Sequence, residues 1–179
     1  MNKFLLKSTF CLFLILAAGQ LFAQTGIYMT EEDMANKKLT PAEIIGVTHP
    51  FAFQLNVKID GKKKSFKFNE VFGFVYTDGT IYRTQSMTDG QLAPFMYIAS
   101  GDNFLWGGIG GQPYISETLA GPAYKVNEET MNQLGNEHPK LRPFLECCQD
   151  KEKDAKRNKA EIYKECIKQG GGEATAKAH

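Results

Sequence analysis

One stretch of alternating residues closed by a two-residue turn constrains the fold of this chain most. Between positions 51 and 59 every second residue is apolar, a period that predicts a half-buried β-strand. Asp60-Gly61 follows directly, and this pair is typical of tight hairpins because both central residues of the turn take positive φ. The apolar faces then match across the turn, with Leu55 opposite Phe66 and Phe53 opposite Phe68.

Short apolar runs separated by turn residues continue along the chain. Six further strands are predicted, at residues 71–77, 80–85, 95–99, 104–106, 114–119 and 123–126. A two-residue turn at Asp78-Gly79 would place Val75 opposite Tyr82 and Tyr76 opposite Ile81. About eight short strands in an antiparallel meander would form a two-layer sandwich or a partial barrel, because an open sheet leaves its edges exposed.

Helical patterns flank this β domain, which is assigned to residues 51–126. The N-terminal segment, 24–50, contains one short helix that begins at Thr30 with acidic residues after it. The C-terminal segment, 127–169, contains helices whose apolar residues fall on single faces. These faces comprise Leu141, Phe144, Leu145 and Cys148, and then Ile162, Tyr163, Cys166 and Ile167. The fold class is therefore mainly β (α+β), with C-terminal helices and a disordered tail at 170–179.

The first 23 residues have the pattern of an export signal. Lys3 and Lys7 form a basic start, an apolar run follows, and cleavage after Ala23 would leave Gln24 as the new N-terminus. The apolar run is far shorter than the roughly 20 residues that cross a bilayer. We therefore expect an exported protein, periplasmic or secreted, that does not span the membrane once the signal is removed.

The order of these parts resembles a known group of proteins. The motifs that carry the resemblance are Gly26–Asp33, Lys38-Leu39-Thr40, Phe66-Lys67-Phe68 and Val71–Phe74, downstream of an export signal. Over most of residues 24–135 the chain is similar to small uncharacterised exported proteins common in the Bacteroidota. This resemblance implies an envelope or secreted protein and brings no established activity, cofactor or catalytic residue.

Three cysteines, Cys147, Cys148 and Cys166, follow the predicted signal segment. In an oxidising compartment one pair can form a disulfide and leave the third thiol free. If one continuous helix connected Cys148 to Cys166, its ends would lie about 27 Å apart, too far for a bridge. A Cys148–Cys166 disulfide therefore requires a helix break near Asp150 or Asn158, and the other expectation is buried free thiols.

A glycine-rich segment offers the one candidate ligand cleft. Gly107-Gly108-Ile109-Gly110-Gly111 lacks the lysine and the following helix of a phosphate-binding loop, so a loop or bulge between strands is the first interpretation. The alternative is a cleft for a sugar or peptide, because aromatic rings beside permissive backbone suit such ligands. Its residues would be Trp106, Gly107, Gly108 and Tyr114.

The sequence contains no convincing catalytic or metal-binding set. His49 and His138 each precede a proline, and the spacing of a zinc site or a nucleophile elbow is absent. Asp60, Asp78 and Asp89 are explained by turns. We therefore predict no cofactor, no metal and no catalytic residue. The hypothesis is a non-enzymatic module that binds an envelope protein, a glycan or a peptide, and the alternative is a small envelope hydrolase that uses carboxylates.

Charge gives one further indication about partners. The whole chain has a formal net charge of +1, which argues against a nucleic-acid-binding protein. Lys62-Lys63-Lys64 lies at the tip of the predicted hairpin, where lysines both meet solvent and protect a strand edge. Binding of this run to an anionic lipid or polysaccharide is the alternative interpretation.

Overall fold

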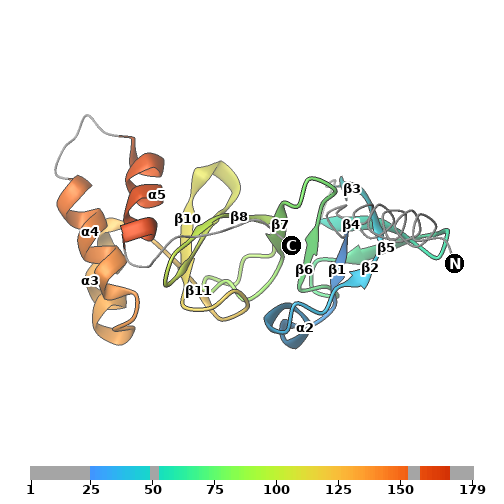
Figure 1. The fold of residues 1–179 in the computed structure, drawn as a ribbon, viewed down its shortest axis with the longest axis horizontal. Coiled ribbons are helices and arrows are strands. Elements are labelled where there is room, and N and C mark those ends of the chain that lie inside the picture. Colours follow the sequence, from blue (N-terminus) through green and yellow to red (C-terminus); the bar gives the residue numbers. More distant parts are fainter. Residues whose placement is uncertain (1–24, 49–52, 153–157, 170–179) are drawn as a thin grey trace, which may run out of the picture.

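A computed structural model of the chain describes residues 25–48, 53–152 and 158–169. The predicted signal segment with its Ala23–Gln24 cleavage site, His49, and the tail predicted at 170–179 lie outside the described residues. The strands of the described residues form two antiparallel sheets (Figure 1).

The larger sheet has eight strands in the order β11-β10-β9-β8-β7-β6-β1-β2, and every neighbouring pair is antiparallel. Its strands are β1 (Gly26–Tyr28), β2 (Thr40–Pro41), β6 (Gly73–Val75), β7 (Ile81–Arg83), β8 (Phe95–Ser100), β9 (Phe104–Gly107), β10 (Pro113–Ser116) and β11 (Ala123–Lys125). The smaller sheet has the order β3-β4-β5 and comprises β3 (Glu43–Thr48), β4 (Gln54–Ile59) and β5 (Lys62–Lys67).

Four α-helices complete the described part of the chain. They are α2 (Glu31–Ala35), α3 (Glu128–Glu137), α4 (Arg142–Glu152) and α5 (Lys159–Gln169), with a short 3₁₀-helix, η1, at Ile109–Gly111. The predicted fold class, mainly antiparallel β with C-terminal helices, is confirmed, and of the two predicted arrangements the open sandwich is observed. Within the described ranges, no helix has the length and apolar character needed to cross a membrane.

The Asp60-Gly61 hairpin forms as predicted. Both turn residues have positive φ, 49° and 77°, as the two-residue turn requires. β4 and β5 pair with Leu55 opposite Phe66. Phe53 and Phe68 lie beyond the paired residues, and their rings stack with centroids 5.4 Å apart. Local turn chemistry and apolar alternation therefore specify the same register.

The second hairpin differs from the prediction by one residue. Val75 lies opposite Ile81 instead of Tyr82, which pairs with Phe74. The Tyr76 amide donates to the Thr80 carbonyl, so three residues form the loop instead of two. Gly79 ends this loop with a φ of 82°, the conformation of the bulge residue in three-residue hairpins. Asp-Gly thus occurs in both loop types, and the pair alone cannot distinguish them.

One face of the long sheet is covered by different layers at its two ends. Residues directly opposite one another on neighbouring strands share a face, and the registers place Ile27, Phe74, Leu105 and Ile115 on the same side. The three-stranded sheet packs on Ile27 and Phe74. Helices α3, α4 and α5 pack on Leu105 and Ile115 at the other end (Figure 1).

The opposite face of the long sheet is covered by α2 and by loops. Its core contains Tyr28 and Val75 at one end and Phe95, Trp106 and Tyr114 at the other. Covering residues come from α2 and from the loops after β7 and β10, and they include Met34, Met87, Ala93 and Ala120. The strands of the two ends are joined where β7 meets β8, through the two pairs Tyr82–Met96 and Arg83–Phe95.

Residues 24–50 contribute more β-structure than the sequence predicted. The short helix is present as α2, with Thr30 as its N-cap in a capping box with Asp33. In addition β1 adds to β6 of the long sheet, and β3 adds to β4 of the small one. The β domain therefore begins before residue 51. These strands are very short or interrupted by a bulge at Ile45, so their apolar alternation is weak.

The C-terminal helices agree with the predicted apolar faces. Asn127 caps α3 and accepts a hydrogen bond from the Thr130 amide. All eight residues of the two predicted apolar faces are buried. α4 ends at Glu152 and α5 begins at Lys159, where Asn158 accepts from the Ala160 amide, so the predicted helix break lies at Asn158. The last helix packs against β8 and β9.

Candidate functional site

The aromatic residues proposed for a ligand cleft belong to the core instead. Trp106 is fully buried and Tyr114 is 1% exposed. Trp106 Nε1 donates to Ser116 Oγ, and the Tyr114 hydroxyl donates to Asp89 Oδ2 at 2.6 Å. A Cβ added at Gly108 would lie 3.0 Å from the rings of both Phe95 and Tyr114. The predicted cleft of Trp106, Gly107, Gly108 and Tyr114 is therefore wrong, because these rings fill the space that a ligand would need.

The glycine-rich segment is a connection between strands. It runs from the end of β9 through η1 to β10, and the Gly108 amide donates to the Gln112 carbonyl across it. Gly110 and Gly111 have φ values of 72° and 78°, which side-chain-bearing residues rarely adopt. The first interpretation of this segment, a loop between strands, is confirmed. Its glycines allow the backbone to adopt the positive φ values of this loop.

Arg83 is the buried charged residue that the sequence analysis missed. Its side chain is fully buried, and its guanidinium donates to the carbonyl oxygens of Leu119, Ala120 and Gly121. The charge lies between two rings, 5.3 Å from the centroid of Phe72 and 5.0 Å from that of Trp106. Burial lowers the pKa of Arg83 to about 10, so the side chain is a cation at neutral pH.

The position of Arg83 explains both its role and its absence from the sequence-based candidates. Its hydrogen bonds hold the loop after β10 against β7, 36 to 38 residues away in the chain. Nothing near Arg83 in sequence marks such distant partners. Arg83 Nε has no hydrogen-bond partner among the described residues, so the guanidinium is held by one edge. We interpret Arg83 as a clamp between distant parts of the fold.

His138 takes part in a small polar cluster at the end of α3. Its Nδ1 lies 3.4 Å from Glu117 Oε1, and its ring lies 4.2 Å from the ring of Tyr124, centroid to centroid. Lys140 Nζ lies 3.7 Å from the other oxygen of Glu117. Burial raises the pKa of the Tyr124 hydroxyl, and the nearby charges of Glu117 and Glu137 raise it further.

This cluster has a base and a carboxylate but no activated nucleophile. The neighbouring hydroxyl, Ser116 Oγ, donates to the Thr118 carbonyl and accepts from Trp106 on the opposite face of the sheet. A nucleophile has to lie within hydrogen-bond reach of its base. The contacts of His138 instead connect the loop after β10 to the turn between α3 and α4, so the cluster joins two segments of the fold.

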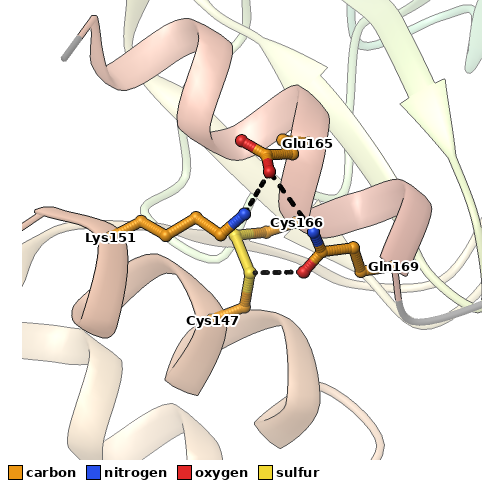
Figure 2. Close-up of a disulfide and its surroundings, with 5 residues drawn as sticks. All are labelled: Cys147, Lys151, Glu165, Cys166 and Gln169. Carbon is orange, nitrogen blue, oxygen red and sulfur yellow. Dashed lines mark hydrogen bonds and ion pairs between the residues drawn. A yellow bond between two sulfur atoms is a disulfide. The ribbon is translucent and has the colours of Figure 1, made fainter.

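A disulfide joins the last two helices, and it uses a different cysteine from the one proposed. Cys147 of α4 is bonded to Cys166 of α5, with their Cα atoms 5.7 Å apart (Figure 2). The proposed Cys148–Cys166 pair is wrong, and Cys148 is a buried free thiol. Cys148 lies on the apolar face of α4 that packs into the helical core, whereas Cys147 is only partly buried beside α5.

Polar contacts surround the disulfide. Lys151 of α4 forms an ion pair with Glu165 of α5, and Gln169 Nε2 lies 3.3 Å from the same carboxylate (Figure 2). Cys147 Sγ lies 3.4 Å from Gln169 Oε1; this is a contact and not a hydrogen bond, because a bridged sulfur carries no proton. The helix pair is therefore fixed covalently and by charge.

Cys148 should react very slowly in the native protein. Burial raises the pKa of this thiol to about 12, and Glu152 adds to the effect. At pH 8 its thiolate fraction is then about a thousandfold smaller than that of a thiol with a pKa of 9. We expect maleimide to label Cys148 rapidly in urea and hardly at all in native buffer, as followed by mass spectrometry. Equal labelling rates in the two conditions would contradict the buried position.

The aspartates of the turns have the structural roles that the sequence indicated. Asp78 Oδ1 accepts from the Thr80 amide at 2.8 Å, and Asp89 Oδ1 accepts from the Gln91 amide at 3.2 Å. The hydrogen bond from the Thr80 backbone is the main cause that lowers the pKa of Asp78. Within residues 25–48, 53–152 and 158–169, no group of three His, Cys, Asp or Glu side chains could hold a metal ion.

The outward side of the three-stranded sheet is the most distinctive exposed surface. The registers place eight polar side chains on this side, which we call the polar sheet face. Its residues are Glu43, Thr48, Gln54, Asn56, Lys58, Lys63, Ser65 and Lys67. The inward side of the same strands carries Leu55 and Val57, both fully buried. The alternation that builds the core therefore also collects polar and basic groups on one flat surface.

Comparisons with known proteins give no information about function, so a functional conclusion has to rest on the geometry described above. No family model, curated protein or solved structure matches the chain. The fold and its surface define the class of the protein in structural terms alone. It is a two-sheet antiparallel β protein with a disulfide-linked pair of C-terminal helices and a basic, polar outer sheet face.

Proposed function

We propose that this chain is an exported, non-enzymatic binding protein of the cell envelope or the extracellular space. The observation that carries the proposal is the Cys147–Cys166 disulfide between α4 and α5. Structural disulfides persist in oxidising compartments and are rare in the reducing cytoplasm. The disulfide therefore supports the same destination as the export signal predicted at residues 1–23, from an independent part of the chain.

The chemistry of the described side chains supports binding in preference to catalysis. Among the described residues, the buried groups that could serve as a nucleophile or an electrophile have structural roles. Cys148 lies in the helical core, Ser116 bonds to Trp106 and Thr118, and Arg83 holds three carbonyl groups. Catalytic groups need to converge on a space that a substrate can enter. The exposed polar sheet face offers instead an extended surface for a ligand.

Thiol counting after export tests the proposal. The full chain and a variant lacking residues 2–23 would be produced in bacteria, denatured without reductant, and labelled with a maleimide of high mass. We expect one label on the exported chain, at Cys148, and three on the chain kept in the cytoplasm. The exported C148A variant should carry none, because the remaining two cysteines are bridged. A full chain that stays in the cytoplasm with all its thiols free would refute the proposal.

A further inference from the structure

We propose that the polar sheet face binds an extended acidic polysaccharide. This inference rests on the proposed function and specifies its ligand. The face consists of the outward side chains of β3, β4 and β5, at the end of the molecule opposite the C-terminal helices (Figure 1). Charge, unmet hydrogen-bonding capacity and shape each support this ligand.

Positive charge is concentrated on β4 and β5, and Glu43 of β3 is the one carboxylate on the polar sheet face. Residues 54–67 contain five lysines and one aspartate, a net charge of +4, whereas the whole chain has +1. Among the described residues, no carboxylate forms an ion pair with Lys62, Lys63, Lys64 or Lys67. Lys58 Nζ lies 3.5 Å from Glu43, but both side chains are well exposed, so that pair is weak and can open.

Protection of the sheet edge does not explain the whole arrangement. Lysines on an edge strand such as β5 hinder unwanted strand pairing. Lys58, however, lies on the central strand β4, between Glu43 of β3 and Lys63 of β5. Like charges at directly opposed positions destabilise a sheet, and the exposed Glu43 offsets only part of the repulsion between Lys58 and Lys63. An anionic group bound between these two ammonium groups would relieve the rest.

Hydrogen-bonding groups lie beside the charges. The Ser65 hydroxyl donates to Asn56 Oδ1 at 2.5 Å, and Asn56 Nδ2 donates to Thr48 Oγ1 at 3.2 Å. This row crosses all three strands and still leaves hydroxyl lone pairs exposed to solvent. Sugar hydroxyls can bond to such groups while acidic substituents meet the lysines.

The dimensions of the face favour a polymer over a single small anion. Lys63 and Lys67 point to the same side of β5 and lie four residues apart, about 13 Å along the strand. One small anion cannot contact both. A chain that carries a charge on successive sugar units can contact both and also cross to Lys58.

The composition of the face favours a glycan over a membrane surface. Proteins that lie on membranes insert apolar or aromatic side chains beside their basic residues. The eight residues of the polar sheet face are all polar or charged. Phe53 and Phe66, the aromatic residues next to it, pack on the inward side against the core. On these three strands, Ile45 at the bulge of β3 is the one large apolar side chain that is exposed, whereas binding to a bilayer uses a group of such anchors.

Binding to polygalacturonate, an acidic polysaccharide, tests the inference. We expect the oxidised protein to bind this polymer in low salt, to release it in about 0.5 M NaCl because salt screens exposed charges, and to ignore neutral dextran. K58Q/K63Q/K67Q should weaken binding about tenfold or more, since three exposed charge contacts are lost. K38Q/K164Q/K168Q changes the charge equally at exposed positions elsewhere and should bind within about twofold of the wild type.

Each other outcome overturns the inference. These outcomes are no binding, equal weakening by both triple variants, or binding to vesicles of phosphatidylglycerol but not to polygalacturonate. Matching urea midpoints for the two variants would show that both are folded. If the protein is exported and oxidised but does not bind the polymer, only the glycan inference is refuted. If the protein stays reduced in the cytoplasm, the proposed function is refuted, whatever the protein binds in vitro.

Discussion

Replacing Arg83 with alanine should destabilise the folded protein by about 3–5 kcal/mol. The change removes the donors of three carbonyl oxygens in the loop after β10, of which that of Ala120 is buried and those of Leu119 and Gly121 are partly buried. It also removes a large, fully buried side chain that fills the space between Phe72 and Trp106. No buried carboxylate loses a partner, so the expected loss comes from packing and from the carbonyl groups.

Two further variants separate these causes, with urea unfolding as the measurement. R83M retains most of the volume and leaves the carbonyls unpaired, so we expect a loss of about 1–3 kcal/mol. R83K retains a charge and donors but not the planar fork, and it should also lie between wild type and R83A. Trp106 is the one tryptophan of the chain, so its fluorescence reports directly on this site. If R83A unfolded at the same urea concentration as the wild type, Arg83 would not stabilise the contact between β7 and the loop after β10.

Loss of the Cys147–Cys166 disulfide should lower the free energy of unfolding by about 3 kcal/mol. The bridge spans 19 positions of sequence, and reduction would restore the conformational freedom of that loop in the unfolded chain. For a chain of this size the loss corresponds to a decrease in Tm of roughly 6–12 °C. Thermal unfolding with and without reductant measures it, provided that the reductant reaches the bridge.

Cys148 supplies the control for this experiment. C148A removes the free thiol and keeps the bridge, so its Tm should still fall on reduction by the same amount as in the wild type. C147S should resemble the reduced protein and show no further response to reductant. A C147S variant that responds like the wild type would mean that the bridge is formed by other cysteines.

Local patterns in the sequence predicted the fold class and several details. The Asp60-Gly61 turn and the alternation before it determine the register of β4 and β5, because turn type and apolar side agree. The apolar faces of α4 and α5 are likewise visible at helical spacing. In each case the residues that decide the structure are close together in sequence.

Features that depend on distant partners could not be predicted in this way. β1 has three residues, and its place beside β6 follows from packing of Ile27 against Phe74, 47 positions away. The choice of Cys147 over Cys148 depends on how α4 packs, which the sequence of α4 alone does not specify. Arg83 likewise has partners that only the folded chain brings near.

The candidate binding surface was only partly visible in the sequence. Lys62-Lys63-Lys64 stood out as a run, yet the structure divides it, because alternate residues of a strand point to opposite sides. Only Lys63 of the three joins Lys58 and Lys67 on the polar sheet face. The contribution of Thr48 required the position of β3, which the sequence did not indicate.

The short pairing between β7 and β8 has a consequence for how the molecule opens. Two pairs of strand residues connect the half that carries the three-stranded sheet to the half that carries the helices. On the opposite face of the long sheet, however, one core continues across this junction, from Tyr28 and Val75 to Phe95 and Trp106. Arg83 lies on β7 at the junction and bonds to the loop after β10. Separation of the two halves would have to break these hydrogen bonds and expose the shared core, so we expect the halves to unfold together instead of as separate cooperative units.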